Sequence, residues 1–173
     1  AEPLYKECLG LRTSILGKNH PDTLVSMNNL AVLYLQKGEY SKAEPLYKEC
    51  LELQTSLFGN NHPDTLGSMS NLAALYLNKG EYSKAEPLYK ECLELRTSLL
   101  GKNHPDTLKS MNGLAEMYMN YPKYSEAESL YKESLELRTS LLGKNHPDTL
   151  LSMNNLAILY FKKGEYSKAE PLY

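Results

Sequence analysis

The chain lacks the sequence features of membrane and secreted proteins. No hydrophobic run approaches the roughly 20 residues that a membrane-spanning helix requires, and nothing at the N-terminus has the pattern of a signal peptide. Its 19 basic and 21 acidic residues give a net charge of -2, so it also lacks the positive charge with which proteins bind nucleic acids. We therefore expect a soluble cytoplasmic protein that binds neither membranes nor nucleic acids.

The chain has only three cysteines and no pattern of metal-binding residues. Cys8, Cys50 and Cys92 recur at one fixed interval, without any C-x-x-C or mixed Cys/His spacing. If each occupies the same place in a stacked unit, they lie about 10 Å or more apart. A disulfide needs Cα atoms within about 7 Å. We interpret all three as small core residues.

Catalytic motifs are absent as well. The sequence contains no phosphate-binding loop, no catalytic triad and no paired-carboxylate motif. His20, His62, His104 and His146 each precede Pro-Asp, but a zinc or catalytic site needs ligands that converge, and these are strung out at equal intervals. We interpret them as helix-start residues, and we predict no enzymatic activity, no metal and no cofactor.

A repeat of 42 residues dominates the sequence. The segment A-E-(P/S)-L-Y begins at Ala1, Ala43, Ala85, Ala127 and Ala169, and NHPDTL recurs in each interval between them. Repeats of this length indicate a solenoid, in which each unit buries its apolar face only by stacking on its neighbours. The expected product is an extended concave surface without a catalytic pocket.

The apolar spacing within one repeat predicts two helices. The first opens at His20-Pro21-Asp22-Thr23, where Pro and Asp both suit a helix start, and it ends near Gly38. Leu24, Met27, Leu30, Ala31 and Tyr34 follow the three- and four-residue spacing of one helix face. The second helix is expected to begin with a capping box at Ser41-Lys42-Ala43-Glu44 and to end at Gly59 as a C-cap.

The same pattern predicts one all-α domain over residues 1–173. It comprises a truncated second helix at 1–16, complete helix pairs at 20–58, 62–100 and 104–142, and a first helix with a partial second helix at 146–173. The chain starts and ends inside second helices, as a fragment of a longer array would. No polar capping unit is expected at either end.

The repeat resembles the tetratricopeptide (TPR) motif. The matching residues run Met27-x2-Leu30-Ala31-x2-Tyr34-x3-Gly38-x-Tyr40-x2-Ala43-x3-Tyr47-x2-Cys50 in the first copy, with Met replacing the usual Trp. The longer unit, with HPDTL and KGEYSKAEPLYKECLEL, is similar to TPRs of the kinesin light chain type. This resemblance implies a right-handed superhelix of antiparallel helix pairs, whose first helices line a concave face that binds linear peptide motifs.

Differences between the copies are concentrated on the first helices. More than half of the repeat positions are identical in every copy, whereas the positions of Val25, Val32, Leu35 and Gln36 hold three or more residue types. At roughly 100° per residue, most of these residues point away from the predicted core face. Exposed apolar residues rimmed by polar ones mark interaction sites. The alternative is that a tightly curled superhelix buries part of this surface.

A polar ladder, mostly of asparagines, lies along the same helices. Its residues are Asn28, Ser70, Asn112 and Asn154, with Asn29, Asn71 and Asn155 beside them. An amide side chain both donates and accepts hydrogen bonds, so it can hold a peptide backbone; alternatively, one member of each pair bonds a neighbouring helix. Together these positions form the first-helix face, which we predict to bind the partner. Its residues are Val25, Asn28, Asn29, Val32, Leu35, Gln36, Ser70, Asn71, Ala74, Leu77, Asn78, Lys109, Asn112, Glu116, Met119, Asn120, Leu151, Asn154, Asn155, Ile158, Phe161 and Lys162.

The third copy departs most from the others. Lys109 and Glu116 place charges on the first-helix face, and Tyr121-Pro122-Lys123 replaces Lys-Gly-Glu. We expect a changed connection and a loosened helix end there, because Pro cannot adopt the left-handed C-cap conformation.

Two functions remain open at this point. The first is a scaffold that binds an extended peptide or partner helix, and the second is a structural array that associates head to tail through its uncapped ends.

Overall fold

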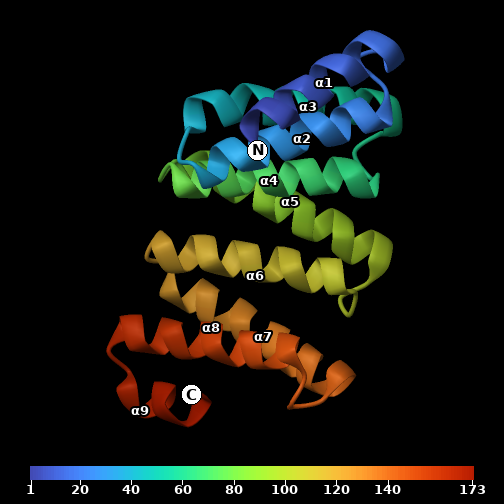
Figure 1. Cartoon of the computed structure of the whole chain (residues 1–173). Helices are drawn as coiled ribbons and strands as arrows, with labels where there is room; N and C mark the ends of the chain where they lie inside the picture. The colour runs from blue at the N-terminus through green and yellow to red at the C-terminus, as the bar shows by residue number, and fades with distance from the viewer. The chain divides into compact units, whose positions relative to one another are not determined.

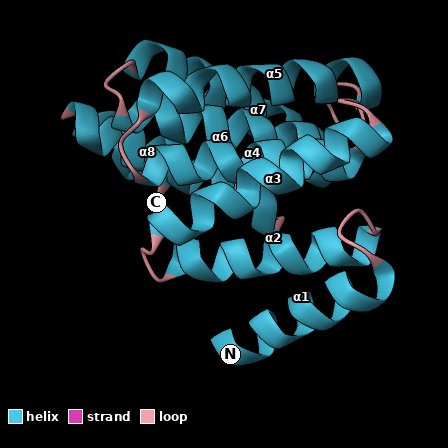
Figure 2. Ribbon diagram, turned by 90° about the horizontal axis from the view of Figure 1, so that it is seen from above, coloured by secondary structure: helices cyan, strands magenta, loops and turns pink.

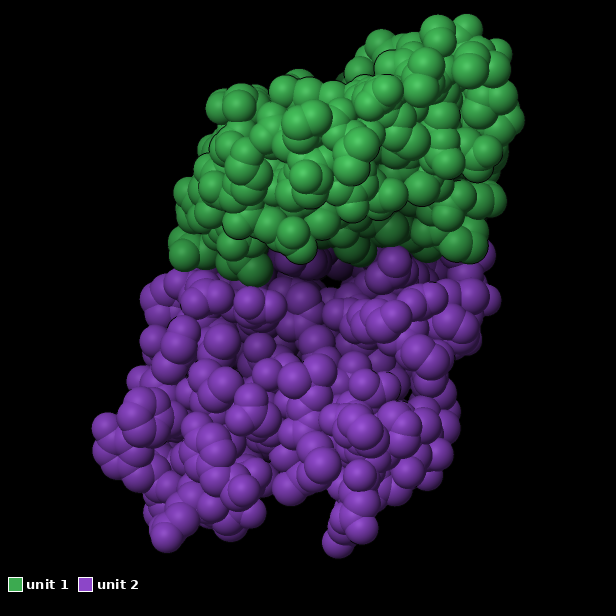
Figure 3. Space-filling model, viewed as in Figure 1, with its two compact units in different colours: residues 1–88 green, residues 89–173 purple.

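The computed structural model describes all 173 residues, and they form two compact units (Figure 3). Unit 1 comprises Ala1–Leu88 and unit 2 comprises Tyr89–Tyr173. Helices and loops account for the whole backbone, without strands (Figure 2). None of the helices combines the length and the apolar character needed to cross a membrane.

Unit 1 is a stack of helices joined by short turns (Figure 1). It contains α1 (Glu2–Leu16), α2 (Pro21–Gln36), α3 (Tyr40–Phe58), α4 (Pro63–Asn78) and the beginning of α5 (Tyr82–Leu100). Helix α2 packs against both α1 and α3, α3 packs against α4, and α2 also contacts α4. The first helices α2 and α4 are therefore neighbours within this unit.

Unit 2 repeats the arrangement from the remainder of α5 onwards. It contains α6 (Pro105–Asn120), α7 (Tyr124–Leu142), α8 (Pro147–Lys163) and α9 (Tyr166–Ala169), and the chain closes with a short 3-10 turn at Glu170–Leu172. Helix α7 packs against both α6 and α8, and α9 packs against α8. Helices α2 and α3 together span residues 21–58, α4 and α5 span 63–100, and α6 and α7 span 105–142.

The first helices begin as the sequence predicts, with a histidine as the N-cap. In α2, the Nδ1 atom of His20 accepts a hydrogen bond from the backbone N–H of Asp22 at 3.2 Å, and Pro21 is the first helical residue. His62, His104 and His146 do the same in their helices. The first backbone N–H groups of a helix have no intrahelical partner. These histidines therefore act as N-caps that accept a hydrogen bond from one of those N–H groups.

The predicted capping box at the second helices is wrong. Helix α3 begins at Tyr40, so Glu39 is its N-cap, and no side chain caps it. The N–H groups of Lys42 and Ala43 already bond the carbonyl of Glu39 at 3.0 and 3.2 Å, which leaves Ser41 nothing to cap. The other end agrees with the prediction, because Gly59 closes α3 with a φ of 84°.

The buried face of the first helix α2 matches the predicted one. Leu24, Met27, Leu30, Ala31 and Tyr34 are all buried. Leu24 and Met27 form a cluster with Cys50 of α3. The cysteines are free thiols, as predicted; Cys50 and Cys92 are fully buried and Cys8 is partly buried. Burial raises the pKa of the Cys50 thiol, so it behaves as a small core side chain.

The third connection changes as predicted, but its helix is not loosened. Helix α6 spans Pro105–Asn120 and is as long as α2 and α4. Tyr121 follows it with φ -104° and ψ 89°, whereas Lys37 after α2 is αR and is followed by Gly38 with a φ of 73°. The backbone N–H of Lys123 still reaches the carbonyl of Tyr118 at 3.0 Å, as Glu39 reaches Tyr34 at 2.9 Å. This bond secures the helix end without glycine.

A glutamate near the start of each of three second helices ties it to the following first helix. Glu44 of α3 contacts Lys79 of α4 at 2.6 Å and accepts a hydrogen bond from the hydroxyl of Tyr76 at 3.3 Å. Ion pairs with Lys48 and Lys79 lower the pKa of Glu44 to about 2. Glu2 and Glu128 make the equivalent contacts with α2 and α8, and their pKa values are lowered in the same way.

We predict that Glu44→Gln lowers the free energy of unfolding by about 0.5–1 kcal/mol at pH 7, the size of a partly exposed ion pair. Because the folded-state pKa lies below the ordinary 4.5, this stabilisation is present above about pH 4.5 and is lost as the pH falls towards 2. Urea unfolding at pH 7 and pH 2 measures it. The exposed Glu52→Gln on the same helix is the control; equal effects of the two variants at pH 7 contradict the assignment.

Candidate functional site

The residues of the first-helix face are all at least partly accessible. The exposed members are Val25, Asn29, Gln36, Asn78, Lys109, Glu116, Asn120, Leu151, Asn154, Phe161 and Lys162. The partly buried members are Asn28, Val32, Leu35, Ser70, Asn71, Ala74, Leu77, Asn112, Met119, Asn155 and Ile158. The divergent positions therefore lie opposite the core, and packing covers only some of them partly.

The asparagine ladder is partly satisfied within the protein. In unit 1, the side-chain N–H of Asn71 on α4 donates to Oδ1 of Asn28 on α2 at 3.1 Å. This is the alternative in which one asparagine bonds a neighbouring first helix. An amide retains further donor and acceptor capacity after one such bond, so both residues can still bond a ligand.

Asn112 in unit 2 has a structural role. Its amide, oriented to suit its neighbours, donates to Oγ of Ser134 at 2.9 Å and accepts from the guanidinium of Arg138 at 3.1 and 3.2 Å. Both partners are buried side chains of α7. Because these bonds use one donor and the carbonyl oxygen of Asn112, this amide is a weaker candidate for a ligand than Asn154, which is exposed.

Unit 2 carries a pocket of about 390 Å³ at the end of its first-helix face. Leu108, Leu141, Leu142 and Leu151 supply apolar walls from α6, α7 and α8. Lys109 lies at this pocket and pairs with Asp106 at 3.3 Å. Such a pocket suits an apolar side chain, and predicted residues Lys109 and Leu151 contribute directly to it.

A second, smaller pocket lies at the corresponding place in unit 1. Its volume is about 160 Å³, and its wall includes Val25, Asn28 and Asn71 of the first-helix face together with Gln54 and Gly67. Sequence reasoning missed Gln54, because it lies on a second helix. The signal was present nonetheless, since the other copies carry Arg12, Arg96 and Arg138 at this position.

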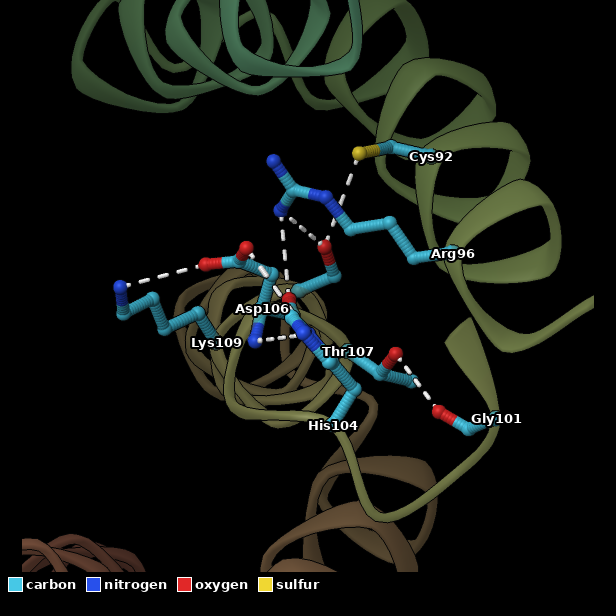
Figure 4. A network of polar contacts seen from close by, with 8 residues as sticks. Cys92, Arg96, Gly101, His104, Asp106, Thr107 and Lys109 are labelled. Carbon is cyan, nitrogen blue, oxygen red and sulfur yellow. Dashed lines mark hydrogen bonds and ion pairs between the residues drawn. The ribbon is translucent and has the colours of Figure 1, made fainter. Parts of the chain in front are cut away.

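Those arginines connect consecutive helices. Figure 4 shows Arg96 of α5, whose Nη1 donates to the backbone carbonyl of Asp106 at 3.3 Å and to Oγ of Ser110 at 2.6 Å. In the same view His104 caps the start of α6, and the hydroxyl of Thr107 donates to the carbonyl of Gly101 at 2.9 Å. No three His, Cys, Asp or Glu side chains gather in a way that would hold a metal ion.

Comparison with known proteins gives consistent results. A family model described as tetratricopeptide repeat matches residues 1–56 and 123–173, and a second model of the same description matches residues 65–106. No curated protein sequence matches the chain.

Several solved structures are similar to the whole chain. One is a variant form of a Podosopora anserina protein assigned as a kinesin light chain, with nearly identical TPR-like repeats; it is 27% identical, with a TM-score of 0.85 and coverage of 99% of this chain and 81% of that one. BtubC (BKLC) from P. vanneervenii is also 27% identical, with a TM-score of 0.83 and coverage of 99% and 68%. NprR shares the fold alone, at 22% identity and a TM-score of 0.67, with coverage of 99% and 49%.

These matches confirm the predicted all-α, TPR-like fold class and the resemblance to kinesin light chain-like repeats. Since the first family model covers more than half of the residues, the chain belongs to the tetratricopeptide repeat family.

Proposed function

We propose that the chain is a protein-interaction scaffold whose first-helix face binds an extended peptide or a partner helix. TPR-like folds typically mediate interactions between proteins. The observation that carries the proposal is the position of the differences between the copies. They fall on an accessible face that includes the exposed apolar residues Val25, Leu151 and Phe161, and such residues favour a contact surface over a merely solvated one.

The two units offer different chemistry on this face. In unit 1 most members from α4 are small or polar, among them Ser70, Asn71 and Ala74. In unit 2 the face combines Leu151 and Phe161 with the charged Lys109. We infer that the unit 2 pocket takes an apolar side chain of the partner, because four leucines form its apolar walls.

A solved structure of similar fold supports the proposal of peptide binding. NprR was solved in complex with its cognate peptide NprX, so this fold is able to hold a peptide. The proposal assigns our chain a peptide or protein partner, a cytoplasmic location and no enzymatic activity.

Introducing a negative charge on the first-helix face tests the proposal. Leu151→Glu and Phe161→Glu should each weaken binding of a peptide selected against the chain by about tenfold or more, or about 1.4 kcal/mol, because each places a carboxylate in an apolar contact. Fluorescence polarisation with peptides carrying apolar or aromatic-acidic residues measures the affinity.

The control is Leu99→Glu, on the exposed surface of α5. Its affinity should stay within about twofold of that of the unchanged protein. If Leu99→Glu weakens binding as much as Leu151→Glu, the contact lies elsewhere or the loss is non-specific, and the proposal fails.

A second candidate function is head-to-tail association of two copies. Leu150 of α8 is 50% exposed, although its equivalents Leu24, Leu66 and Leu108 are 1–3% exposed. On α1, Leu4 and Ile15 are 69% and 75% exposed. In unit 1, Leu46 and Leu53 of the second helix α3 pack against the cluster that contains Leu24, so α1 of a second copy has suitable side chains to cover Leu150.

Analytical ultracentrifugation of the 173-residue chain separates this candidate from the first. Association through α8 predicts a mass that rises with concentration, and Leu150→Glu should shift the protein to monomer at all concentrations tested. A mass that stays monomeric up to about millimolar concentration in the unchanged protein eliminates the candidate.

A further inference from the structure

The arginine of each second helix normally fills a fixed polar place beside the next first helix. Arg12 donates to the carbonyl of Asp22 at 2.8 Å and to Oγ of Ser26 at 2.8 Å. Arg138 makes the same two contacts with Asp148 at 2.9 Å and Ser152 at 2.8 Å. Arg96 provides the third example (Figure 4). These surroundings are therefore shaped and polarised for a guanidinium.

In the remaining copy this place lacks its guanidinium. Gln54 stands at the arginine position, and the residues equivalent to the arginine's acceptors are Asp64 and Ser68. The glutamine side chain is only 5% exposed, and its Oε1 has no hydrogen-bond partner. A buried carbonyl oxygen without a donor is unfavourable, so a donor that reached this atom would stabilise it.

A second difference opens the same place to solvent. Gly67 lies on the wall of the unit 1 pocket, where the other copies have Val25, Lys109 and Leu151. A Cβ added at Gly67 would meet no atom within 4 Å, so nothing covers this side. Both differences therefore affect the same pocket. Gln54 is shorter than arginine and leaves space in it, and Gly67 has no side chain to cover it.

The chemistry of the pocket favours a cationic donor. Its lining offers the oxygens of Gln54, Asn28, Ser68 and Asp64, and contains no lysine or arginine. The Asp64 carboxylate is exposed and adds negative charge. A volume of about 160 Å³ corresponds to roughly five water molecules, which accommodates a guanidinium and part of its methylene stem.

We propose that this pocket binds an arginine side chain of the partner, whose guanidinium takes the position that Arg96 and Arg138 occupy in unit 2. This inference rests on the proposed function, which supplies the partner. It adds the identity of the side chain that the partner inserts into the unit 1 pocket. A guanidinium with its planar, forked donors suits the oxygen acceptors of this pocket better than an ammonium does, since the equivalent places hold arginine.

The test is a titration followed by amide NMR with N-acetyl-L-argininamide as the probe. The proposal predicts saturable shifts at Gly67, Ser68 and Asn71, and at least fivefold weaker binding of the uncharged analogue N-acetyl-L-citrullinamide. Gln54→Arg should weaken argininamide binding at least tenfold and raise the unfolding temperature, because the protein then supplies its own guanidinium. Equal binding to the unchanged protein and to Gln54→Arg, or equal affinity for the two probes, overturns the proposal.

Gly67→Leu provides a second variant that adds no charge and narrows the pocket with the residue found at position 151. It should also weaken argininamide binding at least tenfold, whereas Leu99→Glu should leave it unchanged; unaltered binding to Gly67→Leu overturns the proposal. The probe is a single residue, so it reports on the pocket without a bound peptide. Binding of the probe together with failure of every peptide in fluorescence polarisation would contradict only the proposed function.

Discussion

The structure depends on one constraint, which is that a helix pair of this sequence cannot bury its own apolar side chains. Leu24 and Met27 of α2 are buried with Cys50 of α3, and Leu9 of the preceding second helix α1 packs against the same cluster. The hydrophobic free energy of such contacts, about 25 cal/mol for each Å² of apolar surface buried, requires every first helix to turn one face towards the second helices. That requirement fixes the core face and leaves the opposite face free to vary.

Much of the fold could be predicted because its signals are local. The 42-residue period shows where each copy begins. Within a copy, a few neighbouring residues mark the helix ends: histidine and proline at the start of each first helix, and glycine at position 59 after a second helix. The start of the second helices was harder to place, because the carbonyl of Glu39 occupies N–H groups that Ser41 was expected to cap. The helix end at Tyr121 also depends on a backbone bond between Lys123 and Tyr118 that composition does not reveal.

The candidate site was predictable in outline but not in detail. Comparison of the copies located the accessible face, since residues that pack the core have little freedom to change. It could not show that Asn112 bonds Ser134 and Arg138, because those partners lie on another helix at a distance in sequence. It also passed over Gln54, whose meaning depends on the place that three arginines fill in the other copies.

The two pockets show how a nearly uniform repeat can acquire selectivity. A few substitutions give unit 1 an acceptor-lined pocket and unit 2 a leucine-lined one, while the helix pairs beneath them stay alike. Under the proposed function, different repeats would bind different parts of one partner without any change of fold. Specificity for the partner would then come from the positions where the copies differ.

A crystal structure of the chain with a peptide selected from a random library tests the central claim most directly. Our account predicts density for the peptide against α2 and α4, against α6 and α8, or along both pairs, with contacts to residues of the first-helix face. A peptide bound instead to the outer surfaces of α3, α5 and α7, with the first-helix face uncovered, would contradict it.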